Sequence, residues 1–218
     1  MKRKNDEMIN HSTEELKTIL QWEIASGSLK SAQRLVEAHL CERFQVKRHR
    51  IREVLRELER EGFVKIVPNV GAAVTSVSQK DIEQAYDLLG VLEGLAVRVI
   101  TPFIKHEQLA SLEKLLRKME STDVPSEFER YNDEFHSLIT YWSENDRLRK
   151  FTDNLRQNQK RFASHSFLSP GQIQASRLDH RRMFEAMKHG KPVEAERLMR
   201  SHLLRAKNRL IKYMNKSL

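Results

Sequence analysis

The hydrophobic positions of this chain recur at helical spacing almost throughout. Apolar side chains return every three or four residues, in stretches that end at Gly, Pro or Ser. The exception is a pair of β-rich runs at 64–67 and 72–77, which flank a Pro-Asn-Val-Gly turn in the manner of a hairpin. The pattern therefore predicts a mainly α protein with one hairpin near residue 70.

The N-terminal part is predicted to form three helices before the hairpin. Ser12 and Glu15 fit a capping box at the start of the first helix, which should end near Gly27. We expect a second helix at about 32–43, with His39 on its inner face. With a third helix after it, three helices and a hairpin describe a winged helix-turn-helix.

The third predicted helix, within 45–63, combines a basic first turn with an apolar stripe. No acid occurs between Glu42 and Glu53, while hydrophobic residues recur from Ile51 to Leu58. An anchored stripe below an exposed basic turn is the form of a DNA recognition helix. The alternative is a solvated basic face, which is common on helices. The candidates for DNA contact are Lys47, Arg48, His49, Arg50 and Arg52.

After residue 77 the sequence is helical nearly to its end. Six helices are expected, at about 79–100, 106–121, 126–143, 147–165, 170–189 and 192–214. We therefore predict two domains: a winged helix at 1–77 and an all-α, six-helix effector-binding bundle at 78–218, which can bury its own core.

Three histidines of the second part lie on apolar stripes, each on a different predicted helix. They are His136, His180 and His202, and Asn132 lies one turn before the first of them. Three imidazoles and one oxygen can hold a divalent transition metal, with zinc or nickel as the leading candidates. The alternative is three separate core histidines, each satisfied by a hydrogen bond.

Composition adds weaker constraints. The net charge of +9 favours a polyanionic partner, but it is spread over both parts, with 14 − 11 = +3 in residues 1–77 and 25 − 19 = +6 in the rest. A single cysteine, Cys41, excludes an internal disulfide framework and fits a reducing cytoplasm. No secretory signal and no membrane-spanning run is expected.

Two sets of residues together resemble a known family. Residues 46–62, VKRHRIREVLRELEREG, are similar to the GntR-family motif V-S-R-x-x-V-R-E-A-L-x-x-L-x-x-E-G. The second part resembles the FCD effector domain of the FadR-type branch, and its six helices resemble the VanR-like subgroup. The residues that carry this second resemblance are Leu92-Glu93-Gly94, Asn132 with Phe135-His136, Asn145 to Leu148, and His180 with His202.

The resemblance implies a homodimeric bacterial transcription factor that binds a palindromic operator and responds to a small-molecule effector. It also implies a metal held by an amide oxygen and three imidazoles, carried over by position to Asn132, His136, His180 and His202. Many relatives hold an effector's carboxylate with an Arg where this chain has Leu89. Leucine cannot form a carboxylate clamp, which leaves three alternatives: an uncharged effector, an acid whose carboxylate binds through the metal, or an effector that is not an acid.

The winged helix also departs from the family pattern. Lys47 replaces the usual N-capping Ser, and Ala38 stands where relatives often carry an Arg that contacts phosphate, a role that Arg34 could take. Val70 replaces a common wing Arg, so we expect the wing to contact DNA through its backbone near Gly71.

Two other functions are less consistent with the sequence. A metal-dependent hydrolase built on the histidines is disfavoured, because Asp179-His180 has the reverse of the phosphohydrolase order and no other catalytic motif is present. We also expect no second carboxylate on the inner stripes to act as a base, so the chain is predicted not to be an enzyme. A sequence-independent nucleic-acid binder would use the basic residues of the last helix, Arg197, Arg200, Arg205, Lys207, Arg209 and Lys212.

Overall fold

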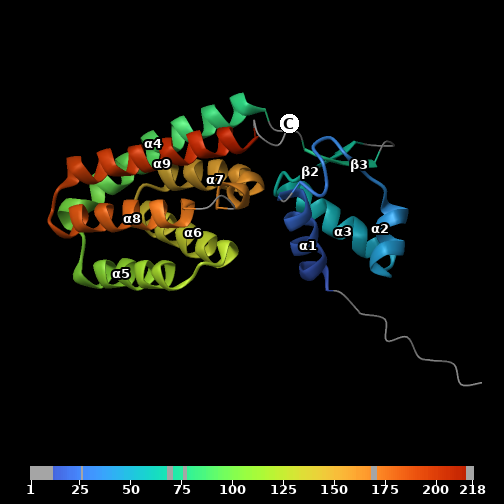
Figure 1. Cartoon of the computed structure of the whole chain (residues 1–218), viewed down its shortest axis with the longest axis horizontal. Helices are drawn as coiled ribbons and strands as arrows, with labels where there is room; N and C mark the ends of the chain where they lie inside the picture. The colour runs from blue at the N-terminus through green and yellow to red at the C-terminus, as the bar shows by residue number, and fades with distance from the viewer. Residues whose placement is uncertain (1–11, 26, 68–70, 76–77, 168–170, 215–218) are drawn as a thin grey trace, which may run out of the picture. The chain divides into compact units, whose positions relative to one another are not determined.

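The computed structural model describes residues 12–25, 27–67, 71–75, 78–167 and 171–214 (Figure 1). The chain divides into two compact units, Met1–Val77 and Ser78–Leu218. Among the helices so described, none is long and apolar enough to cross a membrane.

The first unit is a winged helix-turn-helix. Its antiparallel sheet has the strand order β1-β3-β2 and lies beside three helices whose apolar faces meet in one core. Its elements are α1 (Thr13–Ala25), β1 (Arg34–Leu35), α2 (Glu37–Phe44), α3 (Arg48–Arg60), β2 (Val64–Val67) and β3 (Gly71–Val74). The capping box that the sequence predicts opens α1, since the Glu15 amide donates to Ser12 Oγ and the Ser12 amide to Glu15 Oε2.

The second helix begins later than the sequence predicts. Ala32 has a left-handed backbone (φ 61°), so a helix cannot pass through it. Arg34 and Leu35 instead pair with β3 as a third strand, and α2 starts at Glu37. His39 is consequently exposed, and its expected place on the inner face of this helix is wrong.

The recognition helix has the form that the apolar spacing predicts. Its buried face consists of Ile51, Val54, Leu55 and Leu58. Lys47 is the N-cap residue and makes no side-chain capping bond. The chain enters α3 through Gln45, which adopts a left-handed conformation (φ 54°) and ends α2. The wing turn lies outside the described residues, and with it Val70, which stands where relatives commonly carry an Arg.

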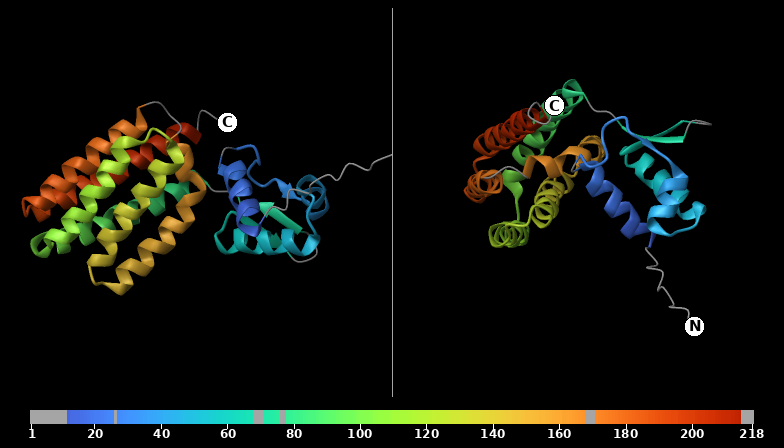
Figure 2. Two further views of the ribbon diagram at one scale, coloured as in Figure 1. Left: turned by 90° about the horizontal axis from the view of Figure 1, so that it is seen from below. Right: turned by 45° about the vertical axis from the view of Figure 1, so that its right-hand side comes forward.

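The second unit is an all-α bundle, which confirms the predicted fold class. A capping box of Ser78 and Asp81 opens its first helix. Figure 2 shows α4 and α9 running side by side over much of their lengths. The elements are α4 (Gln79–Ile100), the short 3-10 helix η1 (Thr101–Phe103), α5 (His106–Ser121), α6 (Pro125–Trp142), α7 (Asp146–Phe167), α8 (Gln172–Lys188) and α9 (Pro192–Met214).

Candidate functional site: a buried histidine cluster and a basic recognition helix

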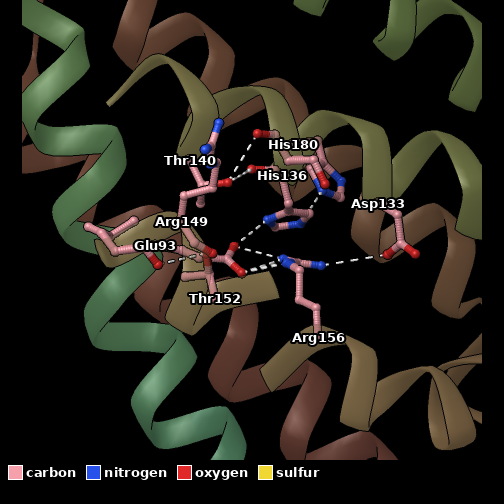
Figure 3. Close-up of polar contacts among 10 residues, drawn as sticks. Glu93, Asp133, His136, Thr140, Arg149, Thr152, Arg156 and His180 are labelled. Carbon is pink, nitrogen blue, oxygen red and sulfur yellow. Dashed lines mark hydrogen bonds and ion pairs between the residues drawn. The ribbon is translucent and has the colours of Figure 1, made fainter. Parts of the chain in front are cut away.

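Three histidines from three helices of the bundle meet in its interior. His136 comes from α6, His180 from α8 and His202 from α9, and all three are at most 3% exposed. Their ligand-capable nitrogens lie within 4.8 Å of one another. The Nε2 atoms of His136 and His180 are 3.2 Å apart (Figure 3).

Each of the three imidazole rings is oriented by a hydrogen bond from its Nδ1 atom. The Nδ1 of His136 donates to Glu93 Oε2 at 2.6 Å. The Nδ1 of His180 donates to the carbonyl oxygen of Ser176 at 2.8 Å, and that of His202 to Asp179 Oδ2 at 3.3 Å. Carbonyl and carboxylate oxygens only accept, so all three protons are on Nδ1 and the Nε2 lone pairs are left for a ligand.

Burial also keeps these rings uncharged. Desolvation, reinforced by the nearby Arg156, lowers the pKa of His136 to about 4 despite its contact with Glu93. Burial likewise lowers the pKa of His180 and of His202. Two neutral rings with facing Nε2 lone pairs repel each other at 3.2 Å. A cation between them would turn that repulsion into attraction.

Glu93 is the centre of a second layer of contacts. Its carboxylate is fully buried and accepts from Arg156 Nε at 2.6 Å and Nη2 at 2.7 Å, besides the bond from His136. Arg156 on α7 also lies 3.6 Å from Asp133 Oδ1 (Figure 3). Burial opposes ionisation, but Arg156 and His136 outweigh it and lower the pKa of Glu93 to about 2. Glu93 is therefore a carboxylate at neutral pH.

The donor set fits a divalent transition metal. Tetrahedral ligands at the usual zinc–nitrogen distance are about 3.3 Å apart, close to the 3.2 Å between the two Nε2 atoms. Asn132 lies one turn before His136 on the same helix and is also buried. Its Oδ1 is buried without a hydrogen-bond partner among the described residues. A buried acceptor without a partner costs folding free energy unless a ligand interacts with it.

The structure corrects the expectation that no carboxylate accompanies the histidines. Glu93 and Asp179 both lie on inner faces and contact His136 and His202. Neither is free to act as a base, because Arg156 holds the first and Arg205 holds the second at 2.6 Å. Glu93 could have been suspected from the sequence, since it interrupts the apolar stripe of α4; Arg156 carried no such signal.

Four of the six basic residues predicted on α9 are paired with acids. Arg205 pairs with Asp179 and Lys207 with Asp87, each within hydrogen-bond distance. Two more of the six predicted residues pair with acids of the same helix, Arg197 with Glu194 and Arg200 with Glu196. These four ion pairs lower the net positive charge of the α9 surface, which disfavours the non-specific binder.

The predicted DNA-contacting residues lie in two places on the winged helix, around the first turns of α3 and where β1 pairs with β3. Lys47, Arg48, His49 and Arg52 are exposed around the first turns of α3, and Arg50 is half-buried. Arg34 is exposed on β1, and its guanidinium approaches Gly71 at the start of β3: a Cβ built there would lie 3.9 Å from Arg34 Nε. Gly71 has φ +107°, a conformation that other residues rarely adopt.

Sequence and structure comparisons agree with this architecture. The profile of the gntR family of bacterial regulatory proteins matches residues 12–74, and the FCD domain profile matches residues 84–205. The chain belongs to the GntR family, with an FCD domain. It is thus a DNA-binding transcriptional regulator, and its relatives bear regulator names rather than enzyme names.

Individual relatives are distant. The HTH-type transcriptional regulator YdhC of Bacillus subtilis is 28% identical over 183 residues, or 82% of each chain. The HTH-type transcriptional repressor RspR of Escherichia coli is 24% identical over 196 residues, covering 85% of this chain and 82% of the repressor. Among solved structures, E. coli McbR/YncC has a TM-score of 0.71 at 18% identity, over 92% of this chain and 97% of that one, a likeness of fold alone.

Proposed function

We propose that this GntR-family regulator binds a palindromic operator as a homodimer and is controlled by a small-molecule effector in its FCD domain. We further propose that the domain holds a divalent metal, with zinc or nickel as the leading candidates, through Asn132, His136, His180 and His202. The single observation that carries this is the convergence of three buried, neutral imidazoles, whose Nδ1 atoms are all engaged elsewhere. The six helices after the wing support the FadR-type, VanR-like assignment.

Operator binding rests on α3 and its surroundings. Arg48 and Arg52 rise from a helix whose opposite face is buried, so their exposed guanidiniums can reach base edges. Lys47, His49, Arg50 and Arg34 would add contacts to bases or phosphates, with the backbone at Gly71. Arg48→Ala or Arg52→Ala should abolish operator binding and leave the circular dichroism unchanged. Arg56→Ala, exposed further along the same helix, is the matched control.

The residues around the proposed metal have two roles, orienting the imidazole rings and supplying an oxygen ligand. Glu93, Ser176 and Asp179 fix the three rings, and Asn132 supplies a neutral oxygen. When bound, the cation would supply positive charge and open coordination positions. Asn132 leaves that charge uncompensated, where an Asp would neutralise part of it, so an anionic effector would be favoured.

The chain's own side chains offer an acidic effector little else. Leu89 is fully buried and cannot form a carboxylate clamp. The neighbouring cation, Arg156, is already held by Glu93 and Asp133. We therefore infer that an organic acid would bind through the metal. It would regulate only if it prefers one arrangement of the helices over another.

Dimerisation is supported by an apolar stripe along α4. Leu88, Val91, Leu95 and Val99 recur at intervals of three and four residues and are 42–54% exposed. A two-fold axis across the middle of the stripe would pack it against its own copy, as a self-complementary interface requires. Leu95→Glu should convert dimer to monomer in sedimentation experiments, whereas Leu178→Glu, equally exposed on α8, should not.

The experiment that tests the metal is elemental analysis of freshly purified protein, combined with an anomalous-scattering map. About one divalent metal per chain at the histidines would support the proposal. Protein with intact histidines that binds no zinc or nickel, even at micromolar excess, would refute the metal and leave the DNA-binding function standing.

A further inference from the structure

One carboxylate joins two arginines of the recognition helix. Arg48 donates from Nε to Glu37 Oε2 at 2.7 Å, and Arg52 donates from Nε to both carboxylate oxygens at 3.1 Å. The two arginines are one turn apart on α3, while Glu37 is the first residue of α2. Their side chains remain 66% and 56% exposed, against 24% for Glu37. The acid thus anchors two guanidiniums that otherwise face solvent.

This geometry leaves the two terminal nitrogens of each guanidinium available to contact DNA bases. A guanidinium is a rigid plane with five N–H donors. When Nε is held by a carboxylate, the two terminal nitrogens still point forward, and they can bind O6 and N7 of guanine together. A group that is already oriented also loses less conformational entropy when it binds.

The carboxylate is itself held firmly. Burial opposes its ionisation, but hydrogen bonds from Arg52 and Arg48 lower the pKa of Glu37, so it is charged at neutral pH. An acid in the first turn of α2 is also favoured by the helix dipole. Because α2 and α3 share one core, the fold fixes the separation between the backbone of Glu37 and that of the two arginines.

We propose that Glu37 is a specificity-determining residue that positions Arg48 and Arg52 to read guanine in the major groove. This inference rests on the proposed operator binding. Glu37 also places a negative charge near the DNA phosphates, which weakens binding to all sequences alike. The same residue therefore raises the affinity for the operator relative to other DNA and lowers the affinity for non-specific DNA.

If Glu37 instead competes with DNA for the two arginines, the opposite result is expected. If Glu37 merely occupied the arginines, DNA would have to displace it, and its removal would strengthen operator binding. A surface ion pair without function would leave the ratio of specific to non-specific affinity unchanged. The sign of the change in that ratio separates the three roles.

The test uses the full-length chain. Selection from a library of randomised DNA duplexes identifies the preferred sequence, and fluorescence anisotropy at fixed salt then gives the affinities for it and for a scrambled duplex. Glu37→Ala should lower the ratio of these affinities about tenfold or more, with non-specific affinity unchanged or higher. Glu37→Gln, which keeps one acceptor, should fall in between.

The matched control is Glu42→Ala. Glu42 is exposed on the same helix, and its replacement removes the same charge. Its carboxylate is not a partner of Arg48 or Arg52 within the described part of the chain. It should keep the wild-type ratio. Replacing operator guanine by 7-deazaguanine removes N7; it should cost the wild type about tenfold and Glu37→Ala much less.

The outcomes are distinct. An unchanged or higher ratio in folded Glu37→Ala, checked by circular dichroism, overturns the positioning role. A wild-type chain that selects no preferred sequence overturns the proposed operator binding, and this inference with it. A loss of ratio in Glu37→Ala that Glu42→Ala does not share supports the positioning role.

Discussion

Replacing Glu93 by Gln should destabilise the FCD domain strongly, although the two side chains have nearly the same shape. Glu93 is fully buried, accepts two hydrogen bonds from Arg156 and one from His136, and carries the charge that balances Arg156. Gln keeps one acceptor oxygen and turns two N–H donors toward groups that are themselves donors. Arg156, whose side chain is only 14% exposed, is left without its main counter-charge.

The expected magnitude follows from the kind of contact that is broken. Removing one partner of a buried ion pair costs about 3–5 kcal/mol, because the other charge remains buried and uncompensated. Total stability of a domain is about 5–15 kcal/mol, so the loss is a large share of it. With roughly 2–4 °C lost per kcal/mol for a chain of this size, the melting temperature should fall by about 6–20 °C.

The assay is thermal and urea unfolding followed by circular dichroism, with Glu120→Gln as the control. Glu120 makes a similar two-donor contact with Arg181, but at the surface, where an ion pair contributes about 0–1 kcal/mol. The double variant Glu93→Gln with Arg156→Met should recover part of the loss, since the guanidinium of Arg156 is then no longer buried without a counter-charge. Equal unfolding temperatures for Glu93→Gln and Glu120→Gln would refute a stabilising role for the buried network.

Three further predictions test other parts of the structure. His180→Ala should abolish co-purified metal while His189→Ala, exposed at the end of α8, keeps it; equal metal content by elemental analysis would count against the cluster. A chelator should lower the melting temperature of wild-type protein and not of His180→Ala, because a ligand at a thousandfold excess over its dissociation constant stabilises by about 4 kcal/mol. Ala32→Gly should stabilise the winged helix by about 0.5–1 kcal/mol in urea, since Ala32 has φ 61°, whereas Ala38→Gly within α2 should destabilise it by a similar amount; the reverse order would contradict the assigned backbone.

Local patterns were enough to predict the helices of the bundle and the recognition helix, whereas α2 begins at Glu37 rather than near residue 32. Hydrophobic spacing and the breaks at Gly, Pro and Ser placed all six helices of the bundle, and the recognition helix with its buried stripe. Strand β1 was missed because it consists of only two residues, Arg34 and Leu35, which form a strand only by pairing with Ala72 and Ala73. A pairing across nearly forty residues leaves no periodic signal in the segment itself.

The candidate site was predictable only in part, for the same reason. Apolar spacing identified three inward histidines, but it did not identify what orients them. The partners of His136 and His202 lie on other helices, and Arg156 is 63 residues from Glu93 in the chain. A charged residue on an apolar stripe requires a buried partner, yet the identity of that partner depends on how the helices pack.

The arrangement of these partners explains how a ligand at the histidines could act on the whole bundle. His136 on α6 is tied to Glu93 on α4, and Glu93 is tied to Arg156 on α7. His202 on α9 is tied to Asp179 on α8, next to His180. Five helices therefore meet at one cluster. Hydrogen bonds join α6, α4 and α7 in one set and α9 and α8 in the other, and the three histidine rings lie against one another between the two sets. A ligand that prefers a slightly different separation of the three rings must shift these helices together, because His136 and His202 cannot move without straining their bonds to Glu93 on α4 and Asp179 on α8.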